Sequence, residues 1–419
     1  MLTGIAVAII VALTSIWTAA RDTGNRFVVC GTLILLTLPY ELFKVSFAGT
    51  LASQHSPFAL YCILIFSLYL AKSLAARRAL KTNGAIVTAA AYVAFVICIT
   101  FYNSGIRGFG TILDNYLAPL LALVILTNER HNIKTNTKYK IQKLICLAAL
   151  YGVLEFALKH NIIYNSIFSQ ADWVSTQWSA TTHRSTSTIG HPLLAATIYL
   201  SAVLLLNRKQ RNYWPYLFIL SLGILSTGSR TALVLLAASI ILRTVQNSPS
   251  NKDIIAISGV TTFVVASYIL GFFDQIIYRF NNSSGSDHVR LALIEYIPEM
   301  LKVSLWGRGI GSSGEIAYNI GFFNAIEIPW IALAIEIGIA GLLISFLAAY
   351  KIISSYGLWR SNLTFFAVLF IMLSSYNSIS VHSPIAFFIA LILFIPNKET
   401  NKEPSSGKDI YFNLNLKEA

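Results

Sequence analysis

The sequence predicts an all-α, polytopic integral membrane protein with about 12 transmembrane helices. Three observations lead to this fold class: 55% of the 419 residues are hydrophobic, only 12% are charged, and the apolar residues form long runs bounded by short polar clusters. The mean hydropathy is +0.64. So little charge cannot cover the surface of a soluble protein, in which about 25% of residues are charged. A soluble enzyme, a nucleic-acid binder and a disordered scaffold are therefore excluded.

A helix needs roughly 17–25 residues to cross a bilayer. The candidate spans are residues 2–20, 27–46, 57–71, 84–102, 108–127, 144–158, 192–207, 213–227, 231–242, 254–272, 329–350, 363–378 and 384–396. The first run lacks the basic segment that begins a signal peptide, and Arg21 follows it, so we expect a retained span. The short run 231–242 predicts a tilted or re-entrant helix. The whole chain, residues 1–419, is interpreted as a single membrane domain.

The Lys and Arg residues predict the orientation of the spans. Basic clusters alternate with segments poor in basic residues; the clusters lie at residues 72–81, 130–143, 208–211, 243–252, 351–360 and in the C-terminal tail. By the positive-inside rule these segments are cytoplasmic, and so is the C-terminus. The net charge of +13 thus reflects topology and predicts no nucleic-acid partner.

Other basic residues are expected to face outward, where topology does not require them. They are Lys44, Arg107, Lys159, Arg184, Arg230, Arg279, Arg290, Lys302 and Arg308. Two outer loops, residues 159–191 and 273–326, are long, and such loops are usually functional. Residues 290–305 predict an amphipathic helix lying on the membrane. The glycines of residues 307–311 favour a plain loop over a phosphate cradle, because the Lys-Ser/Thr ending of a Walker motif is absent.

Two of the outer arginines lie in polar segments beside spans. Arg184 belongs to His-Arg-Ser-Thr-Ser-Thr-Ile-Gly-His-Pro (183–192), and Arg230 to Ser-Thr-Gly-Ser-Arg-Thr-Ala-Leu (226–233). A guanidinium at the mouth of a helical bundle needs an anionic partner, and its fork matches two phosphate oxygens. Snorkelling to the interface is the alternative. For Arg184 and Arg230, together with Arg279 and Arg290, we favour an anion site.

Three further residues are candidates for substrate binding: His191, which precedes Pro192, His288, which stands beside Arg290, and Arg308 in the glycine cluster. The histidines show no metal-ligand spacing, and no pair of cysteines has the CxxC pattern. We therefore predict neither a metal site nor a cofactor. All four cysteines lie inside apolar runs and are expected to be core residues: Cys30, Cys62, Cys98 and Cys146.

Two glutamates follow the larger outer loop. Glu327 can act as a general base for a sugar hydroxyl, or it can be a helix N-terminal charge favoured by the dipole, because Pro329 marks a helix start. The sequence leaves both interpretations open. Glu336 lies deeper, and for it we favour a hydrogen bond to a neighbouring helix.

Four motifs in order resemble the O-antigen polymerase and ligase superfamily (Wzy/WaaL type). They are the Arg-Ser-Thr…Gly-His-Pro segment (184–192), the Ser-Thr-Gly-Ser-Arg-Thr-Ala-Leu turn (226–233), the Arg290…Trp306-Gly-Arg-Gly-Ile-Gly311 stretch, and the Glu336-x-Gly-x-x-Gly-Leu-Leu343 span start. The resemblance covers roughly residues 184–343. Outside this region only hydropathy matches.

The resemblance implies a GT-C-like membrane glycosyltransferase on the outer face of the bacterial cytoplasmic (inner) membrane. Such enzymes take an undecaprenyl-diphosphate-linked oligosaccharide as donor and need no metal. Arg184 and Arg230 would hold the diphosphate leaving group, with Arg290 as a weaker candidate. Besides membrane lipids, the implied partners are a chain-length regulator and a flippase.

Two departures separate this sequence from ligases of the superfamily. Ligases commonly carry His-Asn where Glu327 and Ile328 stand, and Leu where Val234 stands. The resemblance is therefore closer to the polymerase that joins lipid-linked repeat units into O-antigen, capsule or exopolysaccharide. The alternatives are a ligase that transfers glycan to lipid A core, a transporter or flippase, and a structural partner in polysaccharide assembly. A transporter would have to use the intramembrane carboxylates, which are Asp114, Glu155 and Glu336.

Overall fold

The computed structural model describes residues 2–48, 50, 53, 55–105, 108–168, 183–207, 210, 212–246, 284–302, 306–322, 326, 328–356, 368, 370–372 and 410–411. The predicted spans 254–272 and 384–396 lie outside these residues, as does most of 363–378.

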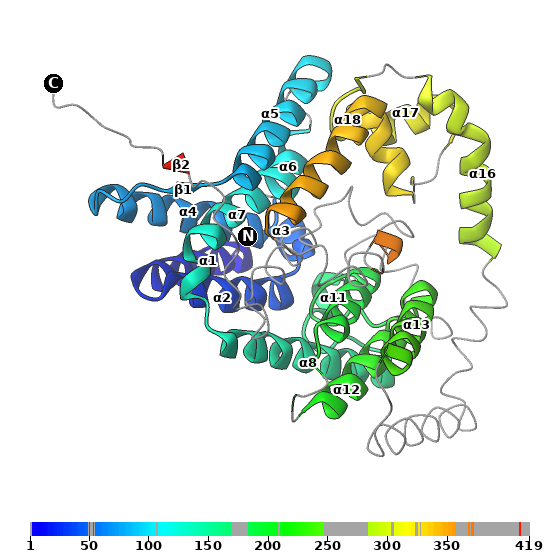
Figure 1. Ribbon diagram of the computed structural model, residues 1–419. Helices are drawn as coiled ribbons and strands as arrows, with labels where there is room; N and C mark the ends of the chain where they lie inside the picture. The colour runs from blue at the N-terminus through cyan, green and yellow to red at the C-terminus, as the bar shows by residue number, and fades with distance from the viewer. Residues whose placement is uncertain are drawn as a thin grey trace. The chain divides into compact units, whose positions relative to one another are not determined.

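The described chain is built almost entirely of helices, as the sequence predicts (Figure 1). The helices are α1 (Leu2–Ala20), α2 (Thr23–Thr37), α3 (Tyr40–Ser46), α4 (Pro57–Ala75), α5 (Gly84–Ser104), α6 (Phe109–Ile112), the π-helix η2 (Leu113–Leu117), α7 (Ala118–Glu129), the 3-10 helix η3 (Arg130–Asn132), α8 (Thr135–Leu158), α9 (Asn165–Phe168), α11 (Pro192–Leu204), α12 (Tyr213–Ser226), α13 (Arg230–Gln246), α16 (Ser284–Leu301), α17 (Ser313–Asn319) and α18 (Pro329–Ser355). Two short strands, β1 (Lys81–Thr82) and β2 (Ile410–Tyr411), pair antiparallel.

Six helical segments of the described chain are long and apolar enough to cross a membrane; one of them, Phe109–Asn132, runs through α6, η2, α7 and η3. The count rises to seven if α2 and α3, which meet at a 60° bend, form one broken span. Three shorter apolar helices start at Pro192, Tyr213 and Arg230. The described residues therefore fit an all-α, multi-pass membrane protein.

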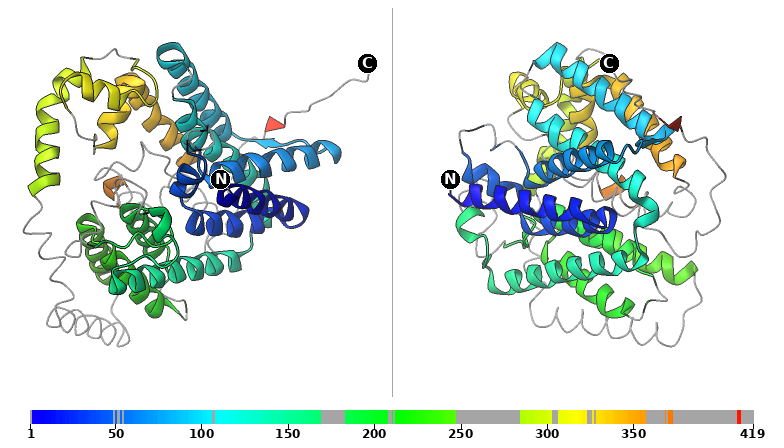
Figure 2. Two further views of the ribbon diagram at one scale, coloured as in Figure 1. Left: turned by 180° about the vertical axis from the view of Figure 1, so that it is seen from behind. Right: turned by 90° about the vertical axis from the view of Figure 1, so that its left-hand side faces the viewer.

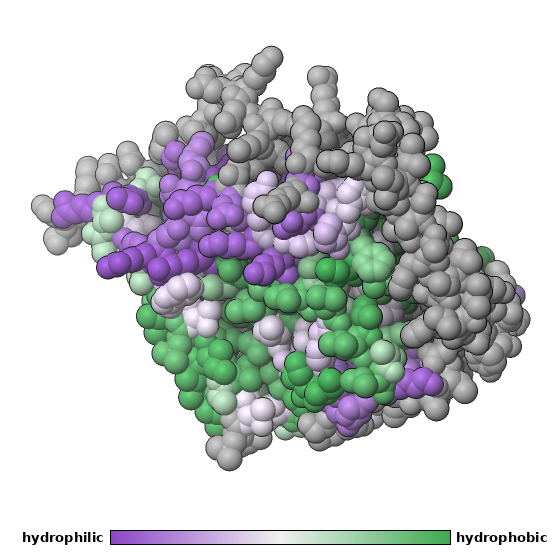
Figure 3. All heavy atoms as spheres, turned by 90° about the horizontal axis from the view of Figure 1, so that it is seen from below, coloured by the Kyte–Doolittle hydropathy of each residue, from purple (hydrophilic) through white to green (hydrophobic). Residues whose placement is uncertain are grey.

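Several of the long helices each leave one apolar face exposed. The exposed side chains include Ile5, Ile9, Leu13 and Ile16 on α1, Leu147, Leu150, Leu154 and Leu158 on α8, and Leu343, Leu347 and Tyr350 on α18. A spacing of three or four residues places each set on one side of its helix. Figure 3 shows one face of the molecule on which hydrophobic side chains cover a broad area bordered by hydrophilic ones. Apolar faces of this extent are expected to contact lipid.

The chain packs as two compact units. The first consists of Met1–Ile141, Glu295–Leu363 and Asn377–Ala419, and the second of Gln142–Ile294 and Thr364–Tyr376. Within the first unit α1 packs on α4, α4 on α7, and α18 on α5 (Figures 1 and 2). Within the second unit α11 packs on both α12 and α13.

Several helix ends lie where the sequence places them. Pro329 is the first residue of α18, as predicted, and Pro192 is the first residue of α11. A helix covers most of the predicted segment 290–305: it is α16, which already begins at Ser284 and ends at Leu301.

All four cysteines are free, and three are buried. The prediction that all four are core residues is wrong for Cys98, which is exposed on α5. A small apolar residue can face lipid as easily as the core of a membrane protein, so hydropathy does not distinguish the two positions.

The helix α18 is broken at Gly338, whose φ of 76° and ψ of 169° are not helical. A helical carbonyl beside such a break loses its usual donor, which is costly in hydrocarbon. Here the carbonyls of Ile335 and Glu336 accept hydrogen bonds from the amides of Arg308 (3.1 Å) and Gly309 (2.7 Å). The glycine loop of residues 307–311 therefore supplies backbone donors at the break.

The same loop is held on α5 from its other side. The Ile310 amide donates to the Thr100 hydroxyl (3.1 Å), and the Ser104 hydroxyl donates to the Arg308 carbonyl. The Ile310 side chain is buried in a cluster with Val96, Ile112, Leu333 and Ile337. The loop is thus an integral part of the first unit.

Candidate functional site

The second unit joins the two arginine-bearing segments that the sequence singles out. The Nε of Arg184 donates a 2.8 Å hydrogen bond to the carbonyl of Thr227, and the amide of Ser185 donates to the carbonyl of Ser226 at 3.0 Å. Arg230 follows at the start of α13. The segment before α11 and the turn between α12 and α13 therefore form one structure.

Arg184 is held in an almost fully buried segment. Its exposed fraction is 9%, and that of its neighbours Ser185 to Ser187 is 0–1%. The bond from Nε orients the guanidinium, whose N–H donors form a rigid planar fork. A guanidinium that is both buried and oriented is suited to bind an anion with two parallel hydrogen bonds.

Arg230 is the first residue of α13, a position that the helix dipole disfavours for a cation. Ser229 precedes it, and its hydroxyl accepts a hydrogen bond from the Ala232 amide at 3.4 Å, in the manner of an N-cap. The Ser229 amide in turn donates to the Thr227 hydroxyl (3.3 Å). A bound anion would be favoured here both by the helix N-terminus and by the side chain of Arg230.

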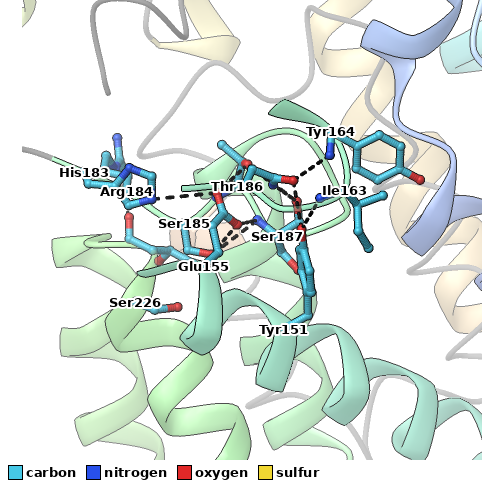
Figure 4. A network of polar contacts seen from close by, with 12 residues as sticks. Tyr151, Glu155, Ile163, Tyr164, His183, Arg184, Ser185, Thr186, Ser187 and Ser226 are labelled. Carbon is cyan, nitrogen blue, oxygen red and sulfur yellow. Dashed lines mark hydrogen bonds and ion pairs between the residues drawn. The ribbon is translucent and has the colours of Figure 1, made fainter. Parts of the chain in front are cut away.

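A buried carboxylate, Glu155 of α8, organises the segment behind Arg184 (Figure 4). Its Oε2 accepts from the Ser187 amide (2.6 Å) and the Ser185 hydroxyl (3.0 Å). Its Oε1 accepts from the amide (3.1 Å) and the hydroxyl (2.9 Å) of Thr186. Glu155 has an exposed fraction of 0%, and both of its oxygens are occupied by donors from three successive residues.

A second layer of contacts supports this arrangement. The Asn161 amide donates to the Thr186 hydroxyl (3.2 Å) and to the Ser187 carbonyl (3.0 Å), while its oxygen accepts from the Tyr151 hydroxyl (2.9 Å). The Ser187 hydroxyl donates to the carbonyl of Ala148 on α8. Ser187 adopts a positive φ of 55°, which is unusual for a residue other than glycine. The network holds the segment in a conformation that the isolated chain would rarely adopt.

Two histidines lie beside the arginine. Burial, and then the positive charge of Arg184, lower the pKa of His191 to about 3. Burial also lowers the pKa of His183 to about 4, with smaller contributions from His160 and Lys159. The His183 Nε2 lies 3.9 Å from Glu155 Oε1. Both imidazoles are therefore neutral at pH 7, so the positive charge of this part of the site comes from the arginines.

Of the other predicted site residues, only Arg308 has a described side chain, and it lies outside this arrangement. Arg308 is exposed and belongs to the first unit. His288 and Arg290 lie on α16. Arg279 and Glu327 lie outside the described residues.

The glycine cluster around Arg308 is a structural loop, as the sequence favours. The amides of Arg308, Gly309 and Ile310 all donate to acceptors of the protein itself. Gly307, Gly309 and Gly311 have positive φ, between 77° and 93°. A Cβ on Gly307 would collide with the backbone of α18 at its break. These glycines allow the loop to lie close against α18 and α5, and no phosphate is needed to explain them.

The three carboxylates in the apolar helical segments share one structural role. Asp114 Oδ2 accepts from the Ser56 amide (2.7 Å), just before α4. Glu336 Oε1 accepts from the hydroxyl of Ser313 (2.7 Å), the first residue of α17, which confirms the predicted bond to a neighbouring helix. Glu155 binds the segment before α11 in the same way. Each carboxylate therefore fixes the segment at the start of a helix.

No protein-family model matches the chain, and no curated protein sequence is similar enough to it to count as a relative. The resemblance to the O-antigen polymerase and ligase superfamily stays a prediction from the four motifs. In the described residues no group of three His, Cys, Asp or Glu side chains is placed to hold a metal ion.

Proposed function

We propose that the protein polymerises oligosaccharide repeat units linked to undecaprenyl diphosphate into a surface polysaccharide. In this proposal it is a metal-independent glycosyltransferase of the bacterial inner membrane with about 12 spans. Its active site faces the extracytoplasmic side, and its C-terminus is cytoplasmic. A flippase and a chain-length regulator of the same pathway would be its partners.

One observation carries the proposal: the Arg184 Nε donates to the Thr227 carbonyl and thereby joins the two arginine-bearing motifs. An oriented guanidinium with neutral histidines beside it, and a second arginine at a helix N-terminus, give this region a positive charge. A lipid diphosphate is the anion that fits an arginine pair beside apolar helices, since its lipid tail stays in the membrane while its phosphates need charged donors.

In the proposed reaction a sugar hydroxyl of one lipid-linked unit attacks the anomeric carbon of the chain carried by another. The bond from that carbon to the diphosphate oxygen breaks, and undecaprenyl diphosphate leaves with the electron pair. Glu327 accepts the hydroxyl proton. Arg184 and Arg230 stabilise the charge that grows on the leaving group, which lowers the barrier because they are oriented before the reaction. A single displacement inverts the anomeric configuration.

The transporter alternative draws less support from the geometry. Transport sites are often built on broken helices and carboxylates that can exchange partners. Here Asp114, Glu155 and Glu336 each bind a helix-start segment, and the carbonyls at the break of α18 accept amides of the glycine loop.

The test uses purified protein and lipid-linked repeat units extracted from the producing cell. Wild-type protein should yield a ladder of longer chains on a gel, and Arg184→Ala and Arg230→Ala should yield none. Arg130→Ala is the matched control, because this guanidinium packs on the ring of Tyr356 at 5.6 Å, in a segment predicted to be cytoplasmic. A full-length ladder from either outer variant would overturn the proposal.

A deletion strain separates polymerase from ligase. Loss of a polymerase leaves one repeat unit attached to the lipid A core, whereas loss of a ligase leaves none. Loss of polymer in the deletion strain, with normal polymer from the Arg184→Ala and Arg230→Ala proteins, would favour a structural role without chemistry.

A further inference from the structure

Glu155 has a burial and a bonding pattern that ordinary helix packing does not require. It lies in an apolar helix, is fully buried, and accepts four hydrogen bonds of 2.6–3.1 Å from Ser185, Thr186 and Ser187. A buried carboxylate is costly unless its oxygens are satisfied. Four donors, two on each oxygen, meet that requirement.

The donor set demands a carboxylate at this position. Two of the four donors are backbone amides, which cannot reverse their direction. A glutamine would place its NH₂ group against at least one of these amides, because only one of its two terminal atoms is an acceptor. The conformation of residues 185–187 therefore depends on the two acceptor oxygens of Glu155.

The segment that Glu155 holds is attached directly to Arg184. Arg184 precedes Ser185 in the chain, and its own side chain is fixed at its other end by the Thr227 carbonyl. Arg184 is thus fixed at two points: its backbone adjoins the segment bonded to the Glu155 carboxylate, and its Nε donates to the Thr227 carbonyl. A displacement of about 1 Å in a positioned group can reduce a rate by about 10²-fold.

We infer that Glu155 is a positioning residue for the diphosphate clamp, the name used here for the Arg184 and Arg230 pair. Glu155 acts through residues 185–187 to set the position of Arg184 and does not touch the substrate. The inference rests on the proposed function and adds a residue that fixes the conformation of the segment beside Arg184. Glu155 holds the arginine in place before the lipid diphosphate arrives, so that binding energy is not used to order the segment.

The test measures the dissociation constant of inorganic pyrophosphate for the purified full-length protein in detergent, together with its thermal midpoint. Glu155→Gln should weaken pyrophosphate binding at least about tenfold, and Glu155→Asp should recover part of the loss because it keeps two acceptor oxygens. The matched control is Asp114→Asn, which also removes a buried carboxylate from the amide of a helix-start segment. It should lower the midpoint and leave the pyrophosphate constant unchanged.

A milder pair of variants covers the case in which Glu155→Gln does not fold. Ser185→Ala removes one donor to Glu155 Oε2, and Ser239→Ala removes an equally buried hydroxyl that bonds only along its own helix α13 in the described contacts. Ser185→Ala should weaken pyrophosphate binding a few-fold, whereas Ser239→Ala should not.

The outcomes separate this inference from the function on which it rests. If Arg184→Ala loses pyrophosphate binding while the Glu155 and Ser185 variants bind as wild type, the positioning role is wrong and the anion site stands. If Asp114→Asn weakens pyrophosphate binding as much as Glu155→Gln does, the loss is explained by general destabilisation of the protein, and the positioning role is wrong. If wild-type protein binds no pyrophosphate, the anion site and the inference fail together.

Discussion

Arg184 and Thr227 stand 43 positions apart in the chain, yet the Nε of the first donates a 2.8 Å hydrogen bond to the carbonyl of the second. The acceptor is a backbone atom, so substitution of the Thr227 side chain would not remove it. The contact uses the inner nitrogen of the guanidinium, the one nearest the aliphatic stem. The outer edge of the fork is therefore set at a defined distance from the turn that leads into α13.

This geometry predicts that Arg184→Lys is not a conservative change. A lysine has one ammonium group, which cannot bond the Thr227 carbonyl and also grip two phosphate oxygens. We expect the KM for the lipid-linked donor to rise about tenfold or more, since a hydrogen bond to a charged group contributes about 1.5–3 kcal/mol. Initial rates with extracted repeat units measure this, with Arg130→Lys as control. Equal kinetics for Arg184→Lys and wild type would contradict the clamp.

Glu327→Gln tests the proposed base. Gln keeps the size of the side chain but cannot accept the hydroxyl proton, so we expect transfer to slow about 10²-fold or more at unchanged protein level in the membrane. The single-turnover rate of glycosyl transfer is the measurement. Normal activity in this variant would leave Glu327 with the helix N-terminal role that Pro329 also suggests.

The glycine loop predicts a stability effect. Gly309 has a φ of 93°, and a Cβ on it would collide with Ser104. We expect Gly309→Ala to lower the free energy of unfolding by about 2 kcal/mol or more, because the strained backbone and the clash add. The thermal midpoint in detergent is the measurement.

Gly314→Ala is its matched control. This glycine lies nearby on α17, and a Cβ there would meet nothing within 4 Å. Alanine is favoured over glycine within a helix by about 0.5–1 kcal/mol, so the midpoint should hold or rise. A fall equal to that of Gly309→Ala would argue against a specific role of the loop.

The buried histidines predict a loss of stability in acid. The pKa of His183 is lowered to about 4, below its unfolded value of about 6.5. Between these values the unfolded chain binds more protons than the folded one, so stability falls as the pH drops through this window and levels off below about 4. His191, with a pKa of about 3, extends the loss to lower pH.

The measurement is the thermal midpoint at pH 7.5 and at pH 5. His183→Asn should reduce the fall of the midpoint between pH 7.5 and pH 5, because it removes one imidazole that must stay neutral in the folded protein. His131→Asn, which changes an exposed histidine in the 3-10 helix, should leave it as steep as in wild type. An unchanged slope in His183→Asn would show that other groups control the acid response.

The sequence predicts the helices well where hydropathy alone decides them. The first predicted span, residues 2–20, coincides with α1, and α18 begins at the predicted Pro329. The run 27–46 looks like one span, but the structure bends it by 60° at Leu38 and Pro39, between α2 and α3. A proline within an apolar run is a signal for such a bend. The mean hydropathy of a sequence window carries no information about whether the helix within it bends.

The candidate site is predictable only in part. Arg184 and Arg230 stand out because each is a charge beside apolar runs. The role of Glu155 has no such signal, because no spacing rule links a residue of α8 to a segment 30 positions later. A lone carboxylate in an apolar helix says only that some partner exists. The partner is set by tertiary packing, which brings α8 and residues 185–187 together.

The break in α18 has a consequence for how the chain enters the bilayer. An unbroken apolar helix satisfies the amides and carbonyls of its interior by itself, whereas this one needs donors from a neighbouring segment at Ile335 and Glu336. Those donors are synthesised before the helix, since residues 308 and 309 precede Pro329 in the chain. The final shape of α18 therefore does not depend on its own residues alone: the helix reaches that shape only when it packs against the glycine loop, which has already been synthesised.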